Sequence, residues 1–480
     1  MMAMASPPVP LSSVPDPVTW PEATAEIRRA RQEIGLRTLV LDDDPTGSQA
    51  VHGLEVVLVS EPKACCDALR SGPAFVLTNS RSLDEADAVH LTKALVQGVD
   101  EHLGNPPGLR FVSRSDSTLR GHLVAEIEVL RAERVRAGHE PYDGILLAPA
   151  FFEAGRVTAE DLHWAKVGGS FIGVGDTEFA RDATFGYSTS HLPTLIEERS
   201  GGTVQREDVL SISLRDIRDG GPDRVAEICR RARGGTWIVV NGLAYDDYDI
   251  VALGALRAEA DGTALAVRCG PSFVRSYLGI EPTSCVDPSV LSWRDRTPRR
   301  HGVVVVGSHT SVTTAQLTGL VDQVGAQVLE LDVEALLDDR RREDVVSTVA
   351  EQVSVELEST VVVVATSRTL VAGHDAQSSL AIARGVSAAL AEILARVIPF
   401  GPAWVVAKGG ITSHDMAVHG LGMRRAEVVG QIFPGQVSIF RPIEATTECR
   451  SIPYVVFPGN VGDASSLAHV VARLEAGEAR

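Results

Sequence analysis

Short runs of aliphatic and β-branched residues alternate with helical patterns along most of the chain. They predict strands at residues 38–41, 54–59, 74–78, 109–112, 145–148, 237–240 and 264–267, and in the second half at 303–306, 327–331, 361–365, 404–407, 437–440 and 454–457. Continuous apolar runs of this length are typical of strands that are buried on both faces. Their alternation with helices predicts parallel sheets built from βαβ units, so we expect an α/β fold.

Two breaks in this alternation divide the chain. Residues 1–20 are rich in Pro, Ser and Val and predict a disordered tail, whereas residues 279–300 change to Pro, Ser, Asp and a basic patch and predict a linker. A chain of 480 residues is long enough for two cores. We therefore expect two domains, at 21–278 and 301–480, each a mostly parallel sheet flanked by helices, with the active site in the cleft between them. Residues 151–186 are Gly-rich and irregular and predict a small hairpin or a lid over a site.

Composition and charge exclude several classes of partner. The chain carries 45 basic and 63 acidic side chains, a net charge of −18, and such a surface repels nucleic acid and anionic membranes. Any phosphate or carboxylate site needs its own positive charge. The six cysteines show no zinc spacing, and no apolar run is long enough to span a bilayer, which predicts reduced thiols in a cytoplasmic protein. The sequence leaves a homodimer open.

The first polar cluster follows the strand predicted at 38–41. Three successive aspartates, Asp42 to Asp44, run into a Pro-Thr-Gly turn. Because ligands of open α/β sheets bind beyond the carboxyl ends of the strands, Asp43 and Asp44 are placed where a general base or a ligand of a polyol hydroxyl would lie. A single Asp at such a place is about as often the cap of a turn or a helix. Three in a row favour the functional interpretation.

Two further polar clusters come after predicted strands. The first is residues 78–81, and the second is residues 113–122, after which apolar residues at helical spacing predict a helix that opens near Leu119. Ser117 or Thr118 would cap this helix, and the free N–H groups of its first turn would attract an anion.

Charged side chains flank that helix start. Arg114 and Arg120 are placed to clamp a carboxylate, and Asp116 is placed to bind a hydroxyl. An ordinary capped helix with surface arginines explains Ser117 and Thr118 but not two arginines and an aspartate that converge in a strongly acidic chain. We therefore expect an acid-binding site here. The mixed charges of residues 175–182 fit a plain surface equally well, and the isolated histidines are interpreted as structural or exposed: His52, His122 and His163.

Glycine-rich loops follow the strands of the second half. Residues 307–311 lie between a strand and a helical pattern, an arrangement that cradles phosphates because backbone N–H groups point at the ligand. Lys408 adds charge before Gly409 and Gly410, which permit close backbone approach. Similar loops lie at 433–435 and 457–462. One such loop is commonly a plain turn, whereas four together favour a nucleotide site.

Two nucleotide-binding motifs are missing from the sequence. There is no GxxxxGK[ST], which excludes a Walker-type fold, and no intact GxGxxG after a strand, which weakens a dinucleotide interpretation.

The motifs resemble those of the four-carbon acid sugar kinase family, which includes threonate, erythronate and 3-oxo-tetronate kinases. The family's Asp-Asp-x-Thr-Gly is matched at residues 43–47, its Ser-Arg at 80–81, and its Asp-Ser-Thr-Leu-Arg-Gly, the most specific motif, at 116–121. Its Gly-Ser-x-Ser-x-x-Thr-x-x-Gln is approximated at 307–316, with Thr310 in place of a Ser, and the pairs at 409–410 and 459–460 also fit. Ile411 and the pair at 48–49 depart from the pattern, which indicates a divergent branch.

The resemblance implies an ATP-dependent kinase that phosphorylates a terminal hydroxyl of a small sugar acid, with Mg²⁺ and ATP held by the C-terminal domain. Asp43 or Asp44 would deprotonate the hydroxyl, and no metal ligand is identified. Substrate contacts are expected from Thr46, Gly47, Ser80, Arg81, Arg114, Asp116, Ser117, Thr118 and Arg120. Nucleotide contacts are expected from Ser308, Thr310, Lys408, Gly409, Gly410, Thr412, Gly435, Gly459 and Asn460.

Two other functions are compatible with the sequence. A non-catalytic sugar-acid sensor of the same fold would bind the acid without ADP release. A nicotinamide-dependent sugar-acid dehydrogenase would bind a dinucleotide, and the missing fingerprint speaks against it.

Overall fold

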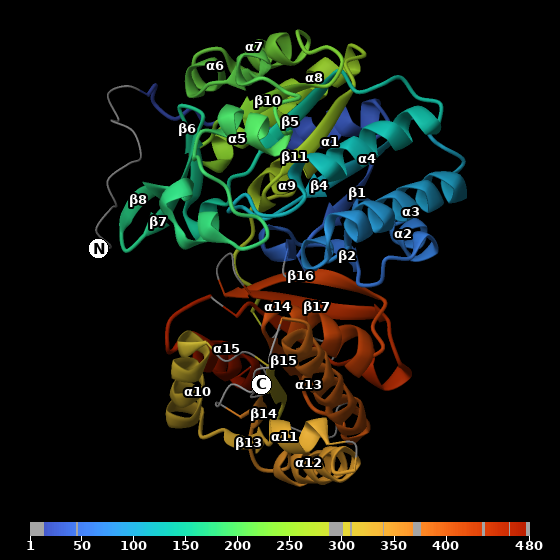
Figure 1. Cartoon of the computed structure of the whole chain (residues 1–480), viewed down its shortest axis with the longest axis vertical. Coiled ribbons are helices and arrows are strands. Elements are labelled where there is room, and N and C mark those ends of the chain that lie inside the picture. The colour runs from blue at the N-terminus through green and yellow to red at the C-terminus, as the bar shows by residue number, and fades with distance from the viewer. Residues whose placement is uncertain are drawn as a thin grey trace. The chain divides into compact units, whose positions relative to one another are not determined.

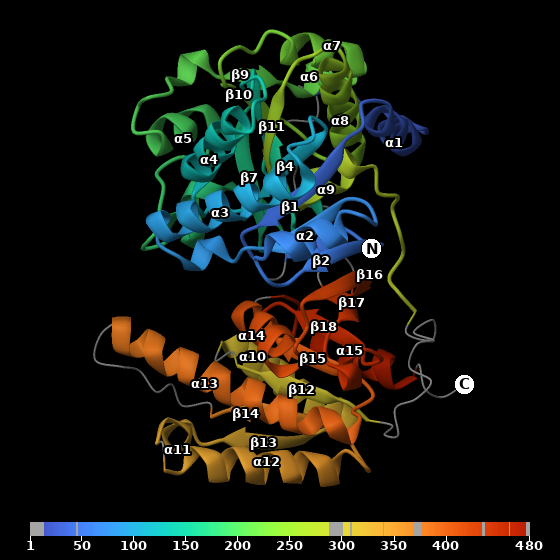
Figure 2. The same ribbon diagram turned by 90° about the vertical axis from the view of Figure 1, so that its right-hand side faces the viewer.

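The computed structural model describes residues 14–44, 47–287, 301–307, 310–338, 340–367, 376–433, 437–459 and 461–476. Its contacts divide the chain into a first unit, Met1–Val51 with Ser60–Pro282, and a second unit, His52–Val59 with Thr283–Arg480. Each unit is an α/β layer structure of strands covered by helices, shown in two views in Figures 1 and 2. The predicted fold class, mostly parallel sheets flanked by helices, is confirmed.

The sheet of the first unit is parallel throughout. Its strands, in spatial order, are β3 (Ala74–Leu77), β1 (Arg37–Asp42), β4 (Leu109–Arg114), β11 (Leu265–Cys269), β5 (Gly144–Ala148), β10 (Thr236–Val240) and β9 (Leu210–Ile212). β5 is buried along its whole length and β1 from Thr38 onward, as strands covered on both faces are. Because all strands run in one direction, their carboxyl ends lie along one edge.

Two groups of helices cover this sheet. One group is α1 (Ala23–Glu33), α6 (Leu214–Arg218), α7 (Gly221–Cys229), α8 (Tyr245–Ala260) and α9 (Pro271–Leu278), which pack on one another. The other is α2 (Pro62–Ala68), α3 (Glu85–Leu103), α4 (Leu123–Arg136) and α5 (Leu192–Arg199). Figure 2 shows α3 and α4 on one side of the strands and α1 and α8 on the other.

A small antiparallel sheet belongs to the first unit as well. It consists of β6 (Arg156–Ala159), β7 (Leu162–Val167) and β8 (Ser170–Gly173), followed by the 3₁₀ turns η5 (Val174–Asp176) and η6 (Glu178–Arg181). The irregular segment 151–186 is therefore a three-stranded meander. A hairpin was one of the two alternatives that its sequence predicts.

The sheet of the second unit is parallel on one side and antiparallel on the other. The parallel strands are β13 (Gln327–Leu331), β14 (Val362–Thr366), β12 (Val303–Val306), β15 (Val405–Lys408) and β18 (Tyr454–Phe457). The antiparallel strands that continue it are β17 (Val437–Glu444), β16 (Arg425–Phe433) and β2 (Leu54–Val57). The fully buried Trp404 lies in its core.

Helices flank this second sheet too. α10 (Ser311–Val324) packs against α15 (Ser466–Ala476), while α11 (Val333–Leu337), α12 (Arg342–Glu356) and α13 (Ala376–Val397) form another group. The short α14 (Gly410–Asp415) follows β15 and continues into a π-helical turn at Met416–Gly420.

The unit boundaries differ from the domain boundaries expected from sequence. Residues 52–59, placed there in the N-terminal domain, belong to the second unit because β2 pairs with β16, from Arg425↔Val57 to Val428↔Leu54. Part of the expected tail is also placed, since the carbonyl of Pro15 accepts a hydrogen bond from Arg218 at 2.7 Å. Most of the expected linker lies outside the described residues.

All six cysteines are unpaired thiols. No helix among the described residues combines the length and the apolar character that a bilayer crossing needs.

Candidate active site

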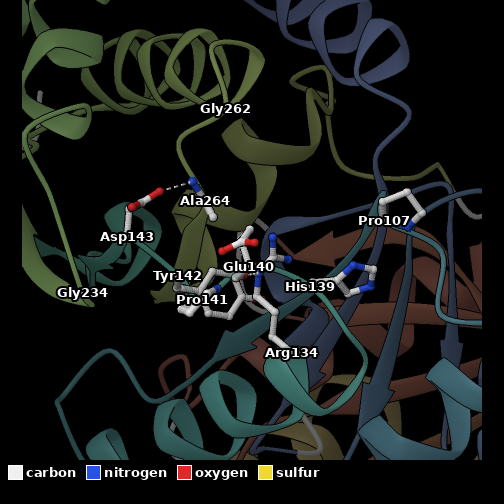
Figure 3. A pocket seen from close by; sticks show the side chains of 10 residues that line it. All are labelled: Pro107, Arg134, His139, Glu140, Pro141, Tyr142, Asp143, Gly234, Gly262 and Ala264. Atoms are coloured by element: carbon white, nitrogen blue, oxygen red, sulfur yellow. Dashed lines mark hydrogen bonds between the residues drawn. The ribbon is translucent and has the colours of Figure 1, made fainter.

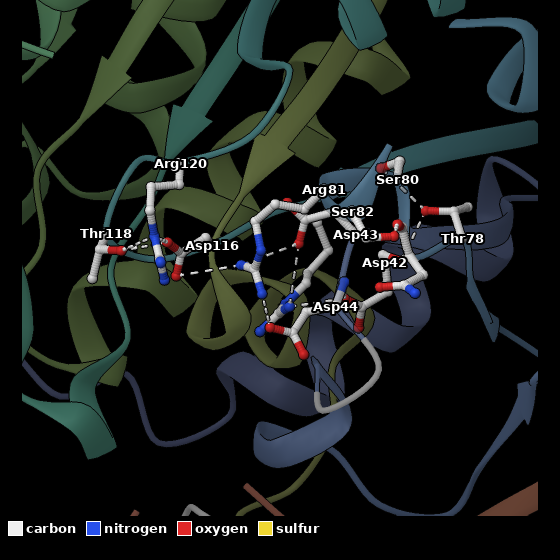
Figure 4. A network of polar contacts seen from close by, with 12 residues as sticks. Asp42, Asp43, Asp44, Thr78, Ser80, Arg81, Ser82, Asp116, Thr118 and Arg120 are labelled. Atoms are coloured by element: carbon white, nitrogen blue, oxygen red, sulfur yellow. Dashed lines mark hydrogen bonds and ion pairs between the residues drawn. The ribbon is translucent and has the colours of Figure 1, made fainter. Parts of the chain in front are cut away.

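Three polar loops of the first unit lie together at the carboxyl edge of its sheet. β1 lies between β3 and β4 and runs parallel to both, so the residues after these strands are neighbours in space. They are Asp42 to Asp44, the segment 78–82 with the 3₁₀ turn η3 (Ser80–Ser82), and the segment 115–122 (Figure 4). The structure thus brings together the described substrate-site residues that the sequence predicts. Thr46 lies outside the described residues.

The three aspartates after β1 have different surroundings. Asp42 Oδ1 accepts hydrogen bonds from Arg114 Nη1 at 2.7 Å and from the Asp44 N–H at 3.1 Å. Asp44 pairs with Arg81. Asp43 is buried, with Arg114 Nη1 at 3.8 Å and Arg81 Nη1 at 3.9 Å from Oδ1, but neither of its carboxylate oxygens has a hydrogen-bond partner among the described residues. Asp43 is therefore the aspartate of the three that has both oxygens free to accept, whereas Asp42 has only Oδ2 free among the described residues.

Burial sets the proton affinity of this pair of carboxyls. It raises the pKa of Asp43 to about 6 against the opposing effect of Arg81 and Arg114, and it raises the pKa of Asp42 to about 6 against Arg114. A buried carboxyl with a pKa of about 6 is mostly ionised at neutral pH and is a stronger base than an ordinary carboxylate, so it is suited to accept a proton from a substrate hydroxyl.

Two glycines make room for these carboxylates. A Cβ at Gly47 would collide with the carboxyl group of Asp42. Gly121, at φ +110°, would place a Cβ 2.9 Å from Asp43 Oδ2. A side chain at either position would displace an aspartate, which explains why glycines occupy these two turns.

Arg81 connects the aspartates of two loops. Besides Asp44 and Asp43, its Nη1 lies 3.7 Å from Asp116 Oδ1 (Figure 4). It is held there by η3, which begins after Asn79 in the left-handed conformation, φ 51°. Left-handed residues other than glycine are uncommon and are found at functional sites more often than elsewhere.

The loop after β4 carries the second charged group of the site. Arg120 Nε donates to Asp116 Oδ2 at 2.7 Å, and the Thr118 hydroxyl donates to the same oxygen. Burial alone would raise the pKa of Asp116, but the charges of Arg81 and Arg120 outweigh it and lower the pKa to about 2. Asp116 is thus a permanent anion, in contrast to Asp43.

The expected helix start at Leu119 is wrong. α4 begins at Leu123, and neither Ser117 nor Thr118 caps it. Leu119 has φ 66°, which stops a right-handed helix from forming there, so residues 117–121 form a turn instead. The small sheet and the segment after it hold this turn in place: His163 Nε2 of β7 lies 2.8 Å from the Ser117 carbonyl, and the Tyr187 hydroxyl donates to the Thr118 carbonyl at 2.7 Å.

Beneath the loops lies a buried network that sequence reasoning missed. Glu126 of α4 accepts hydrogen bonds from Ser80 Oγ at 2.6 Å and from Ser113 Oγ at 2.9 Å, and it pairs with Arg268 of β11. The hydroxyl of Ser80 therefore faces the protein interior rather than a ligand. The signal in the sequence was Arg268 itself, a lone charge inside the apolar strand β11.

Residues after the small sheet complete the site. Asp182 Oδ2 lies 3.7 Å from Arg120 Nη1, and the ring of Phe179 lies 5.1 Å from the Arg120 guanidinium carbon. The segment 175–182, for which a plain surface was equally open, thus contacts the predicted site.

A cavity of about 540 Å³ lies elsewhere in the first unit (Figure 3). Its lining includes Asp143 and Ala264, which directly precede β5 and β11. It therefore opens at the amino edge of the sheet, whereas ligands of such sheets bind at the carboxyl edge.

The glycine-rich loops of the second unit also gather at one sheet edge. β12, β15 and β18 are adjacent and parallel, so their loops follow one another along that edge. Lys408 ends β15, and its Nζ donates to the carbonyls of Pro458 at 3.2 Å and Gly459 at 3.4 Å while lying 4.3 Å from the centre of the Phe457 ring. Burial lowers the pKa of Lys408 to about 8.

Close approach of the backbone recurs in these loops. A Cβ at Gly307 would collide with the Thr412 hydroxyl, and Gly409 has φ +118°. Thr310 caps α10 by accepting the Thr313 N–H at 3.2 Å. Among the other expected nucleotide contacts, Gly410 opens α14 and Gly459 contacts Lys408. Ser308, Gly435 and Asn460 lie outside the described residues.

The described part of the chain holds no group of three or more His, Cys, Asp or Glu side chains arranged to bind a metal ion.

Two family models cover most of the chain. A sugar-binding N-terminal domain matches residues 38–277, and a nucleotide-binding C-terminal domain matches residues 303–467. The first match contains the aspartate and arginine loops, and the second contains Lys408 and its neighbouring glycines.

Two curated relatives and one solved structure are similar to the chain. It is 25% identical over 331 residues to the D-erythronate kinase of Heliobacterium modesticaldum, covering 66% of this chain and 67% of the relative. It is 28% identical over 341 residues to the D-threonate kinase of Bordetella bronchiseptica, covering 70% of each. A crystal structure from Salmonella typhimurium LT2, described as that of a tRNA synthase, matches with TM-score 0.65 at 17% identity over 91% of this chain and 98% of that one, which shows the fold alone. From its two domain matches and these relatives, the chain belongs to the four-carbon acid sugar kinase family, a family of phosphotransferases with a hydroxyl group as acceptor.

Proposed function

We propose that the protein is an ATP-dependent kinase that phosphorylates the terminal hydroxyl of a small sugar acid, of the class of erythronate, threonate or 3-oxo-tetronate. The observation that carries the proposal is Asp43: a buried carboxylate with both oxygens free of hydrogen bonds, surrounded by arginines at the carboxyl edge of the sheet. The names of the two curated relatives support the class of substrate.

Asp43 is the better candidate for the general base, a choice that the sequence leaves open. Asp44 is bound to Arg81 and has less acceptor capacity to offer. Asp43 accepts the proton of the attacking hydroxyl, and its raised pKa places that transfer near neutral pH.

The arginines of the site have two roles: some contact the acid, and one positions the aspartates. Arg81 and Arg120 are partly exposed and contact the acid, together with the turn at Gly47 and the polar loop of Ser117 and Thr118. Arg114 is almost fully buried against Asp42, so its role is to hold the aspartates in place. Catalysis by such a site is mainly positioning and electrostatics.

The nucleotide is assigned to the second unit. Lys408 supplies positive charge, and Gly409, Gly410 and Gly459 let the backbone approach the phosphates. The hydroxyls of Thr310 and Thr412, with Ser308, Gly435 and Asn460, complete the proposed contacts. The proposal requires the acid and the nucleotide to come together during turnover, because in-line transfer needs them within bonding reach.

Mg²⁺ enters with the nucleotide. This ion typically binds one or two carboxylates together with phosphates and waters rather than a full protein cage. Asp42 Oδ2, which lacks a hydrogen-bond partner among the described residues, fits that limited donor set and leaves Asp43 free for the proton. When bound, the ion spreads the charge of the phosphates. The unpaired thiols support a reducing compartment such as the cytoplasm.

The test is ADP formation by the purified protein with MgATP and a panel of three- to six-carbon sugar acids. The proposal expects acid-dependent ADP release with at least one four-carbon acid, none with the matching uncharged polyols, and loss of the signal in Asp43→Asn. Binding of an acid without ADP release would instead favour a sensor. NAD-dependent oxidation of an acid would favour the dehydrogenase.

A further inference from the structure

The arginines that the sequence analysis expects at the substrate are already matched by carboxylates of the chain. Arg114 faces Asp42, Arg81 faces Asp44 and Asp116, and Arg120 faces Asp116 and Asp182. Arg268, below them, faces Glu126. These pairs neutralise the site without a ligand, so they leave little net positive charge to attract an acid.

Arg156 is a cation of a different kind in the same neighbourhood. It is the first residue of β6 and is partly buried. Its side chain has neither a hydrogen bond nor an ion pair within the described ranges. Its guanidinium carbon lies 5.9 Å from the centre of the Phe179 ring, and that of Arg120 lies 5.1 Å from the same centre. Both guanidinium groups therefore border one aromatic ring.

The electrostatic surroundings agree with this placement. Burial lowers the pKa of Arg156, and Asp116 and Arg120 act on it with opposite signs. A contact with an aromatic ring compensates part of the desolvation of a guanidinium group but satisfies none of its N–H donors. A partly buried guanidinium group whose N–H groups have no acceptor is suited to bind a planar anion such as a carboxylate, which accepts two parallel hydrogen bonds.

The frame around Arg156 is fixed by several contacts. β6 pairs with β7 from Arg156↔Ala165 to Ala159↔Leu162. His163 of β7 lies 2.8 Å from the Ser117 carbonyl, so the strand that carries Arg156 is tied through its neighbour to the loop that carries Asp116 and Arg120. A ligand that bridged Arg156 and Arg120 would thus contact two elements already held together.

We propose that Arg156 binds the carboxylate of the sugar acid, in a subsite completed by Arg120 and the ring of Phe179. The inference rests on the proposed function and adds the residue that selects acids over uncharged polyols. Arg156 has no part in the proton transfer assigned to Asp43, so its loss weakens acid binding more than it slows the chemical step.

The test compares Arg156→Met and Arg156→Lys with Arg29→Met in the full-length protein. Arg29 is an exposed arginine of α1, outside the site loops, and serves as the matched control. The probes are D-erythronate and D-threonate with their uncharged analogues erythritol and threitol. KM and kcat are measured with each acid, KM is measured with MgATP, and the dissociation constant of each acid is measured by calorimetry without nucleotide.

We expect Arg156→Met to raise KM and the dissociation constant for the acid by about 100-fold, the usual loss for a charged hydrogen-bonded contact. KM for MgATP and the melting temperature should stay within experimental error. Arg156→Lys should recover part of the affinity, because the charge remains while the fork is lost. Arg29→Met should behave as the wild type.

Unchanged acid affinity in Arg156→Met would overturn the inference, as would an equal loss of affinity for the acid and for MgATP. The calorimetric dissociation constants distinguish failure of the Arg156 proposal from failure of the kinase proposal. If the wild-type protein binds the acids without forming ADP and Arg156→Met binds them more weakly, the kinase proposal is wrong but the proposal of a carboxylate subsite stands. A wild-type protein that binds neither acid would overturn the subsite.

Discussion

The two candidate sites differ in how they use charge. In the first unit, Asp42, Asp44 and Asp116 lie against arginines, and the site is built from pairs of opposite charge. In the second unit, Lys408 bonds to backbone carbonyls and has no carboxylate partner among the described residues. On the proposed assignment, the first site would recognise its ligand with fixed side-chain charges, whereas the second would use backbone groups and glycines around a single cation.

The strongest test of this contrast is the pair Asp43→Asn and Asp44→Asn. Loss of the base should lower kcat by about 10³-fold, within the range for general acid–base catalysis, while KM for MgATP stays constant. Asp44→Asn should lower kcat by only about 10-fold, because Asp44 pairs with Arg81 and does not accept the proton. Steady-state kinetics with the best acid measures both.

Two results would contradict this assignment. Losses of the same size in both variants would mean that Asp43 and Asp44 act as a unit. Near-normal turnover in both would remove the base from this loop altogether. Circular dichroism and melting temperature serve as controls for folding.

The corresponding test in the second unit is Lys408→Met. It should raise KM for MgATP by about 10- to 100-fold and leave the affinity for the acid unchanged, since a single charged contact is lost. In the wild type, MgATP affinity should also fall as pH rises through about 8, where Lys408 loses its proton, and Lys408→Met should abolish that dependence. A lysine that only supports the loop would give no such difference in the pH profile.

The smallest expected effect concerns stability. The folded pKa of Asp43 is raised from 3.8 to about 6, so its stabilising contribution is full below about pH 4 and is lost as pH rises through 6. Asp43→Asn should therefore stabilise the first unit by about 3 kcal/mol at pH 7.5 and by almost nothing at pH 3. Hydrogen exchange followed by mass spectrometry resolves the peptides of each unit.

Asp116→Asn is the matched control of opposite sign. The folded pKa of Asp116 is lowered to about 2, so its contribution is present above about pH 4 and is lost as pH falls through 2. Its replacement should destabilise the first unit by about 2 kcal/mol at pH 7.5. If both variants shifted stability in the same direction, burial and pairing would not be the forces that distinguish these carboxylates.

The strands with continuous apolar runs were predictable from the sequence. β12 and β18 have the bounds that the pattern predicts, because strands buried on both faces leave a plain signal. β13 also has the predicted bounds, although only its last residue, Leu331, is buried. β16 was missed because its burial alternates and it has bulges. The placement of β2 could not be foreseen, since its partner β16 lies about 370 residues further along the chain.

The site was predictable where a loop directly follows a buried strand. Asp43, Arg81 and Asp116 were found in this way, because parallel strands bring their carboxyl ends together. Residues that approach from elsewhere were not, and Arg156 and Phe179 come from the small sheet and the turn after it. The start of α4 was misplaced because periodicity does not reveal the positive φ of Leu119.

The strand β2 has a consequence for any attempt to separate the two halves of the protein. The chain leaves the first unit after Val51, supplies one strand to the other sheet, and returns at Ser60 before it finally crosses again at Pro282. If the chain were cut between the two units near Pro282, the second unit would lose β2. The backbone groups of β16 that pair with β2 would then be exposed, and an exposed strand edge promotes aggregation. A chimaera that exchanges this half between relatives has to carry residues 52–59 along with it.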